Sequence, residues 1–149
     1  MSLVTDLNAA IADAMRKQES VRLGTLRMLK AALMNREIER GGALDADQER
    51  QVVASLVKQR RDSIEQFTKG GRHDLAQKEA AEIGILEAYL PPAADPAAIE
   101  KAVTESISDT GATQPKDIGR VMKAVMAKLA GQNVDGKAVN ELVRRRLGG

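Results

Sequence analysis

The sequence predicts an all-α protein, with a four-helix N-terminal domain followed by a small three-helix C-terminal domain. The first observation is that no proline precedes Pro91, and this long stretch is rich in alanine, leucine, arginine and glutamate, which favour helices. The second is that apolar residues recur every three or four positions, which places them on one face of a helix. The third is that no segment makes a convincing strand.

Four helices are predicted in the N-terminal half, each with an apolar stripe. The second helix is expected to stop at Gly41-Gly42 and the third at Gly70-Gly71, because glycine readily adopts the left-handed conformation that ends helices. Short connections favour antiparallel packing. The residues predicted to form the buried stripes are, in chain order, Leu3, Leu7, Ile11 and Met15; Leu23, Leu26, Leu29, Leu33 and Ile38; Val53, Val57, Ile64 and Phe67; and Leu75, Ile83, Leu86 and Leu90.

Capping signals mark the starts of two of these helices. Asp45 followed by Gln48 is a variant of the capping box, in which two side chains satisfy backbone N–H groups at a helix start. Asp74 followed by Gln77 repeats the same spacing. The third helix is therefore predicted to begin at Asp45 and the fourth at Asp74.

Proline sets the predicted domain boundary. A proline cannot extend a helix, and it biases the preceding residue away from helical angles. We therefore expect a helical domain over residues 1–90, a linker over 91–96 and a three-helix domain over 97–149. The three helices are expected to start at Asp95-Pro96, at Pro115 and at Asp135. Their predicted core residues are Ile99, Val103 and Ile107; Ile118, Val121, Met122, Val125 and Leu129; and Val139, Leu142, Val143 and Leu147.

The composition excludes much catalytic chemistry. The chain has no cysteine, and its single histidine, His73, is expected to be a solvated turn residue. Thiol nucleophiles, disulfides and thiolate or multi-histidine metal sites are therefore excluded. The serines lie in no context that would activate a nucleophile, and no phosphate-binding loop occurs. Glu79 and Glu82 are expected to belong to a solvated helix face rather than to an acid/base pair. We therefore predict a non-catalytic protein without metal or cofactor.

No part of the sequence predicts a membrane or an export signal. No apolar run approaches the ~18 residues that a membrane-spanning helix needs. The N-terminus lacks the basic stretch and apolar core of a signal peptide. From these features we expect no membrane partner and a cytoplasmic location.

Basic residues cluster in the C-terminal part. The whole chain has 23 basic and 21 acidic residues, so its net charge alone does not indicate a nucleic-acid partner. The basic residues of the last two helices provide either solubility and helix-dipole compensation or contacts to phosphates. The candidate nucleic-acid-binding residues are Lys116, Arg120, Lys123, Lys128, Lys137, Arg144, Arg145 and Arg146.

A second basic patch lies in the N-terminal domain. Arg60 and Arg61 interrupt the apolar stripe of the third helix. Either their charges are paired with Asp62, with Glu65 or with a glutamate of the fourth helix, or they contact an anion. The candidate residues of this patch are Lys58, Arg60, Arg61 and Arg72.

Four separated motifs resemble those of a known family. They are RMLKAAL at 27–33, KQRRDS at 58–63, GRHDL at 71–75 and EAYLP at 87–91. With these motifs in this order, the chain resembles the YqeY family of small bacterial proteins. The later part also resembles the tail domain of GatB, the B subunit of the aspartyl/glutamyl-tRNA amidotransferase, on the segments IGRVMK at 118–123 and VNEL at 139–142.

The resemblance implies an all-helical fold and a link to tRNA. Three functions follow as hypotheses: a non-catalytic module that binds tRNA through its shape and phosphates, an accessory component of a carbon–nitrogen ligase that uses glutamine as amide donor, or a helical protein–protein adaptor without an RNA role. The first predicts weak, electrostatic tRNA binding, since the chain has almost no aromatic residues to stack on bases.

Overall fold

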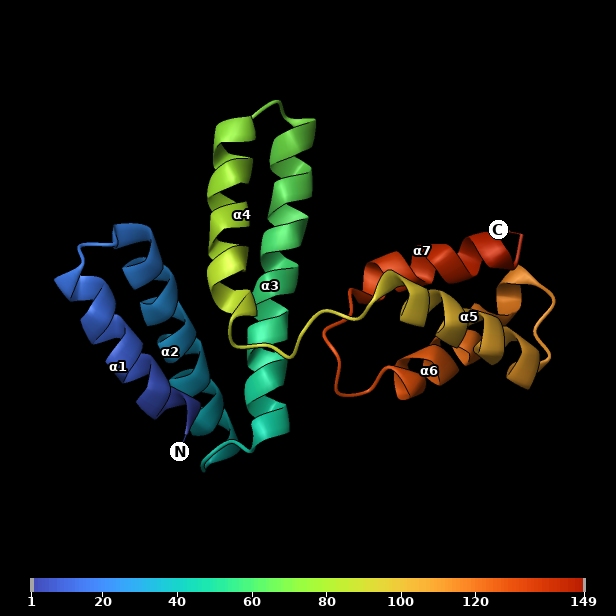
Figure 1. Cartoon of the computed structure of the whole chain (residues 1–149), viewed down its shortest axis with the longest axis horizontal. Coiled ribbons are helices and arrows are strands. Elements are labelled where there is room, and N and C mark those ends of the chain that lie inside the picture. The colour runs from blue at the N-terminus through green and yellow to red at the C-terminus, as the bar shows by residue number, and fades with distance from the viewer. Residues whose placement is uncertain (1, 149) are drawn as a thin grey trace. The chain divides into compact units, whose positions relative to one another are not determined.

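The computed structural model describes residues 2–148 and confirms the predicted all-α fold. In this part of the chain it contains seven α-helices, one 3₁₀ turn and no strand (Figure 1). The α-helices are α1 (Leu3–Arg16), α2 (Ser20–Arg40), α3 (Ala46–Lys69), α4 (His73–Glu87), α5 (Pro96–Thr110), α6 (Ile118–Lys128) and α7 (Gly136–Arg146), and the 3₁₀ turn η1 (Pro115–Asp117) directly precedes α6.

Most predicted helix ends are confirmed. Asp45 and Gln48 form a complete capping box at the start of α3. Asp95 caps α5 with Pro96 in the first turn, and the Asp135 side chain caps α7. Gly41 ends α2 with a φ of 81°, a conformation that costs glycine little because it has no Cβ.

Three local predictions are wrong. Helix α4 begins at His73, and the Asp74 side chain accepts hydrogen bonds from Arg72 instead of capping the helix. Met15 and Ile38 are 53% and 77% exposed rather than buried. A four-residue repeat drifts about 40° around a helix at each step, which turns Met15 away from the stripe that begins at Leu3. Ile38 lies five residues after the buried Leu33, about 140° around the helix.

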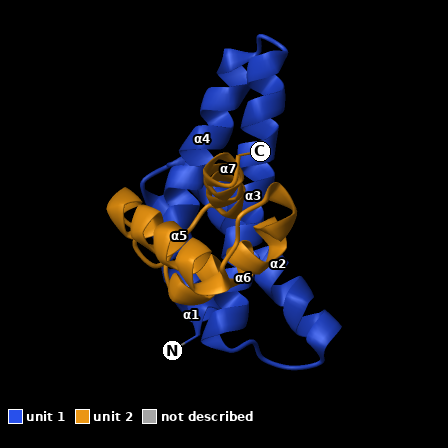
Figure 2. Cartoon of the chain, turned by 90° about the vertical axis from the view of Figure 1, so that its right-hand side faces the viewer, with its two compact units in different colours: residues 1–90 blue, residues 91–149 orange. Residues whose placement is uncertain are grey.

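The chain divides into two compact units, residues 1–90 and residues 91–149 (Figure 2). In unit 1, α3 and α4 lie side by side as an antiparallel hairpin, and α2 packs against α1, α3 and α4 (Figure 1). The core of unit 1 is aliphatic because the chain has so few aromatic residues. Its fully buried large side chains are Leu7, Leu26, Leu29, Leu33, Val53, Val57 and Leu86.

Ion pairs fix the corner between α1 and α2. The Asp13 carboxylate accepts a hydrogen bond from Arg22 at 3.0 Å and pairs with Lys17 at 3.2 Å and with Arg16 at 3.4 Å. The hydrogen bond from Arg22, followed by that from Lys17, lowers the pKa of Asp13 to about 2. Asp13 therefore stays ionised down to about pH 2, and its ion pair with Arg22 joins the two helices.

Unit 2 consists of α5, α6 and α7 around a core of small aliphatic residues. Val103, Val121, Val125, Val139 and Val143 are fully buried.

The preceding segment is tied to unit 2. The backbone N–H of Ala94 donates to the carbonyl of Asn133 at 3.0 Å, and the N–H of Asn133 donates to the carbonyl of Pro92 at 3.3 Å. Residues 92 and 94 of the expected linker are thus hydrogen-bonded to the loop between α6 and α7.

Each unit has its own core, so we expect each to fold alone. Fragments covering residues 1–90 and 91–149 should both show the far-ultraviolet circular dichroism of helices and cooperative urea unfolding. A second C-terminal fragment starting at residue 95 would lack the Pro92 and Ala94 bonds to Asn133 and should be less stable. An unfolded 91–149 fragment would contradict the division.

Candidate nucleic-acid interface

Charge in unit 2 is sorted by helix. From Asp95 to Thr110, the segment of α5 and its cap, there are four acidic residues and one lysine. From Pro115 to Arg146, the segment of η1, α6 and α7, there are eight basic residues and three acidic ones. These eight basic residues are the candidates that the sequence predicted. The acidic and basic side chains of unit 2 therefore lie largely on different helices.

Two of the eight basic residues pair with acidic residues of α5. Lys128 Nζ lies 3.0 Å from Asp109 and 3.7 Å from Glu105, and the hydrogen bond to Asp109 raises the pKa of Lys128. Arg146 Nη2 lies 2.6 Å from a Glu100 oxygen. These two cations link α6 and α7 to α5, and the α5 carboxylates already neutralise their charges.

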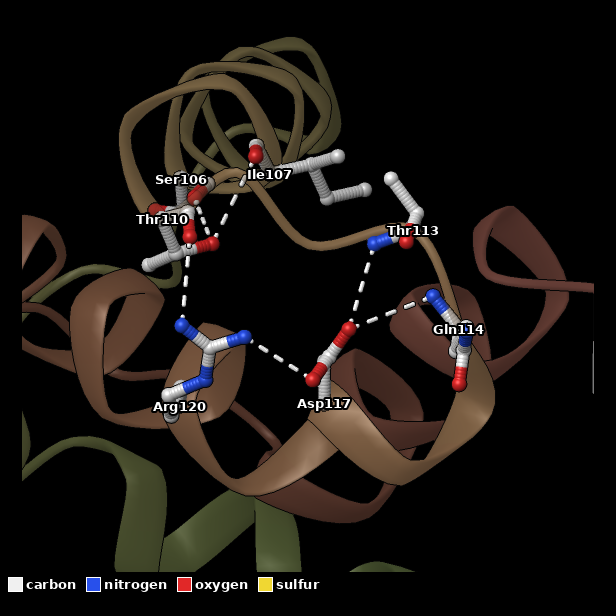
Figure 3. Close-up of polar contacts among 7 residues, drawn as sticks. All are labelled: Ser106, Ile107, Thr110, Thr113, Gln114, Asp117 and Arg120. Atoms are coloured by element: carbon white, nitrogen blue, oxygen red, sulfur yellow. Dashed lines mark hydrogen bonds and ion pairs between the residues drawn. The ribbon is translucent and has the colours of Figure 1, made fainter.

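Arg120 has a structural role at the junction of α5 and α6 (Figure 3). Its Nη2 donates to Asp117 Oδ1 at 2.8 Å, and its Nη1 donates to the carbonyl of Thr110 at 3.2 Å. The other Asp117 oxygen accepts from the backbone N–H groups of Thr113 at 3.2 Å and Gln114 at 3.3 Å. The hydrogen bond from Arg120, followed by that from Thr113, lowers the pKa of Asp117. Arg120 thus holds the loop that leads into α6.

The remaining basic residues of the set are exposed. Lys116, Lys123, Arg144 and Arg145 form no ion pair with an acidic residue anywhere in residues 2–148, and Arg144 donates only to the neutral Asn140 amide, at 3.4 Å. These four residues, together with the exposed Lys137, are called the α6–α7 basic face below.

Helix geometry directs this face away from the acidic residues of α5. Lys123 and Lys128 are separated by about 140° around α6, and Arg144 and Arg146 by about 160° around α7. Since Lys128 and Arg146 pair with α5, Lys123 and Arg144 project on other sides of their helices. Lys137 lies seven residues before Arg144 and so shares its side of α7. Lys123 and Arg144 therefore present positive charge to solvent on sides of their helices away from the α5 carboxylates that pair with Lys128 and Arg146.

The second basic patch has a different arrangement. Arg60 is buried, and its Nε donates to Glu82 of α4 at 2.9 Å. Each of the other three members pairs with a carboxylate as well. The pairs are Lys58 with Asp62 at 3.2 Å, Arg61 with Glu87 at 3.6 Å and Arg72 with Asp74 at 3.1 Å. The geometry corresponds to the ion-pair alternative, with three of the four partners on the fourth helix.

Glu82 lies in a different environment from the one predicted. Its side chain is 13% exposed and faces Arg60, so the expectation of a solvated glutamate is wrong. Arg60 also donates to the Leu56 carbonyl and contacts the Met28 sulfur at 2.9 Å, which brings α2, α3 and α4 together. The sequence contained a signal for this pair, namely an arginine at a core-facing position of the third helix. Because a buried arginine requires an acidic partner, that position predicts a buried glutamate or aspartate on a neighbouring helix.

Two further kinds of feature were sought among the described residues: a metal site and a membrane span. Within residues 2–148, no group of three or more acidic or histidine side chains is placed to hold a metal ion. In the same range, no helix is long and apolar enough to cross a membrane.

Comparison with known proteins identifies the family. The model of the family described as Yqey-like protein matches residues 4–147. The chain belongs to the YqeY-like family. This confirms the resemblance inferred from the four motifs, and the match extends across both units.

Fungal relatives of this YqeY-like chain share the name altered inheritance of mitochondria protein 41, mitochondrial. The protein from Lachancea thermotolerans is 32% identical over 138 residues, which cover 91% of this chain and 70% of the relative. That from Kluyveromyces lactis is 31% identical, over 90% of this chain and 72% of the relative. That from Pyrenophora tritici-repentis is 28% identical, over 95% and 79%.

These relatives contradict the expected cytoplasmic location, because they are named as mitochondrial proteins. The error arose because the expectation rested on amino-acid composition. The cysteine-free composition on which the expectation rested does not distinguish one reducing compartment from another. The prediction of a cytoplasmic protein is therefore withdrawn.

The buried ion pair of this YqeY-like chain gives a stability prediction. Replacing Glu82 with alanine leaves the buried Arg60 charge unpaired and should lower the free energy of unfolding by about 3 kcal/mol. Asp62→Ala is the matched control, because it removes the carboxylate partner of the exposed Lys58 and should cost less than about 1 kcal/mol. Urea unfolding measures both. Equal effects of the two variants would contradict the structural role of the Arg60–Glu82 pair.

Proposed function

We propose that this chain is a non-catalytic module that binds tRNA through phosphate contacts on the α6–α7 basic face. The observation that carries the proposal is the separation of charge in unit 2. Three basic residues are engaged with carboxylates, whereas Lys116, Lys123, Arg144 and Arg145 form no ion pair with acidic residues of the described chain.

The chemistry of the face favours a polyanion. Lysine and arginine groups at an exposed surface gain affinity for nucleic acid by releasing the counterions condensed on its phosphates. They carry little sequence information, because phosphates are the same at every position. The only tyrosine and the only phenylalanine of the chain lie in unit 1. Unit 2 therefore has no aromatic side chain on which a base could stack.

The choice of tRNA among polyanions rests on the resemblance of residues 118–123 and 139–142 to the GatB tail domain. Both segments contribute to the proposed surface. The first contains Lys123 of α6, and the second contains Asn140, whose amide accepts from Arg144 on α7. A helical surface of this kind contacts a folded RNA by its shape and phosphates rather than by reading bases.

Binding should be weak and strongly dependent on salt. If about three phosphates are contacted, the logarithm of the association constant should fall with the logarithm of salt concentration with a slope of roughly −2 to −3. Lys123→Glu combined with Arg144→Glu should abolish most of the binding and reduce the magnitude of that slope by about one for each lost contact. Fluorescence anisotropy with labelled bulk tRNA at several salt concentrations measures both quantities.

A charge-matched control separates the face from net charge. The pair Lys58→Glu and Lys101→Glu changes the net charge by the same amount, but it lies on α3 and α5. This pair should retain most of the wild-type affinity. Equal losses in the two double variants, or no binding by the wild type at low salt, would refute the proposed face and favour the adaptor alternative.

A further inference from the structure

The outward face of α2 is apolar, although the helix is on the surface of unit 1. Met28, Met34 and Ile38 are 44%, 46% and 77% exposed. Scattered exposed apolar residues are ordinary, but here several share one side of a single helix. The exposed residues of this side, called the α2 face below, are Gly24, Arg27, Met28, Ala31, Met34, Asn35 and Ile38.

The spacing of the α2 face is that of a helix–helix contact. Gly24, Ala31 and Ile38 follow one another at intervals of seven residues, which brings each within about 20° of the previous one around the helix. Met28 and Met34 flank this central line on its two sides. A seven-residue repeat of this kind forms the seam along which two helices pack. The buried side of α2, with Leu26, Leu29 and Leu33, is already occupied by the core of unit 1. Met28, whose sulfur contacts Arg60 of α3, lies at the border between that side and the seam.

The pattern is complementary to itself when two copies of α2 run antiparallel. A two-fold axis at Ala31 places Ala31 against Ala31 of the second copy, and the small side chains allow the helix axes to approach closely. The same axis places Ile38 of each copy against Gly24 of the other. A Cβ added at Gly24 would meet no atom within 4 Å, so open space is available there for the isoleucine. The most exposed apolar side chain thus meets the residue that occupies the least volume.

Charge also fits the antiparallel arrangement. Arg27 is the only charged residue of the α2 face, and its Nη2 lies 3.8 Å from the Met15 sulfur of unit 1. Under the two-fold axis, Arg27 lies opposite the Met34 and Asn35 region of the second copy, where its aliphatic stem and guanidinium find an apolar and an amide group. The two Arg27 residues are separated by about 12 Å along the helix axis. That exceeds the screening length of ~8 Å at physiological salt, so they repel weakly.

We propose that the α2 face is an interface with a second copy of this chain, formed by antiparallel pairing of two α2 helices about Ala31. The inference goes beyond tRNA binding and uses no residue of the α6–α7 basic face. One pair of helices buries less area than the roughly 1,200–2,000 Å² of a stable complex, so the dimer should be weak and in reversible exchange.

The natural absence of cysteine makes the register directly testable, because any disulfide must come from an introduced residue. In the full chain, Ala31→Cys should form a covalent dimer under mild oxidation, since the two positions face each other across the axis. Gly24→Cys and Ile38→Cys should each cross-link poorly alone and efficiently when the two proteins are mixed. Ala54→Cys, at an exposed alanine of α3, is the control for random collision. Non-reducing gel electrophoresis measures the dimer fraction.

A second variant tests association without oxidation. Ile38→Lys should raise the dimer dissociation constant at least about tenfold, since it replaces the most exposed of the large apolar side chains by a charge. Met126→Lys, at a 38% exposed position of α6, should leave association unchanged. Sedimentation velocity from micromolar to millimolar concentration measures both.

The pattern of cross-links decides the proposal. Self-linking of Gly24→Cys would indicate a parallel pair and overturn the register. Cross-linking of Ala31→Cys no faster than Ala54→Cys, with a monomeric mass for the wild type at all concentrations, would overturn the dimer and leave the α2 face to another kind of partner.

Discussion

Carboxylates of unit 2 form helix caps and ion pairs that link its helices. The positions of these carboxylates determine which basic side chains at the surface are left without an acidic partner. Asp95 and Asp135 accept hydrogen bonds from backbone N–H groups at the starts of α5 and α7. Asp117 joins the loop after α5 to Arg120. The acidic residues of α5 form ion pairs with Lys128 of α6 and Arg146 of α7, and these pairs link both helices to α5. Because these acidic side chains form helix caps and ion pairs between helices, α6 and α7 keep an excess of positive charge on the sides that do not face α5.

In unit 1, by contrast, the clustered basic residues are paired with acidic residues. There the consecutive Arg60 and Arg61 are matched by Glu82 and Glu87 on the neighbouring helix, and Arg60 is buried. The pair is satisfied by further hydrogen bonds, which a buried charge requires. A cluster of basic residues in the sequence is therefore structural in one unit and exposed to solvent in the other. The difference depends on whether acidic residues occupy the helix packed against it.

The local features of the fold could be predicted from sequence, whereas its cross-helix contacts could not. The cap at Asp45 and the stop at Gly41 depend on a few neighbouring residues, and both were recognised. The exposure of Ile38 depends on where neighbouring helices lie, and the Arg60–Glu82 pair joins residues 22 positions apart. The eight basic residues of unit 2 were found by composition. Their division into docking contacts and an exposed face required the positions of the α5 carboxylates.

The most direct test of the account is to map the tRNA contact on the full chain by nuclear magnetic resonance, with ¹⁵N-labelled protein and unlabelled tRNA at low salt. The charge separation in unit 2 predicts that amide shifts change along α6 and α7, around Lys123 and Arg144, and that α5 around Lys101 changes little. The changes should disappear as salt is raised. Shifts confined to unit 1, or spread evenly over α5, α6 and α7, would contradict the account.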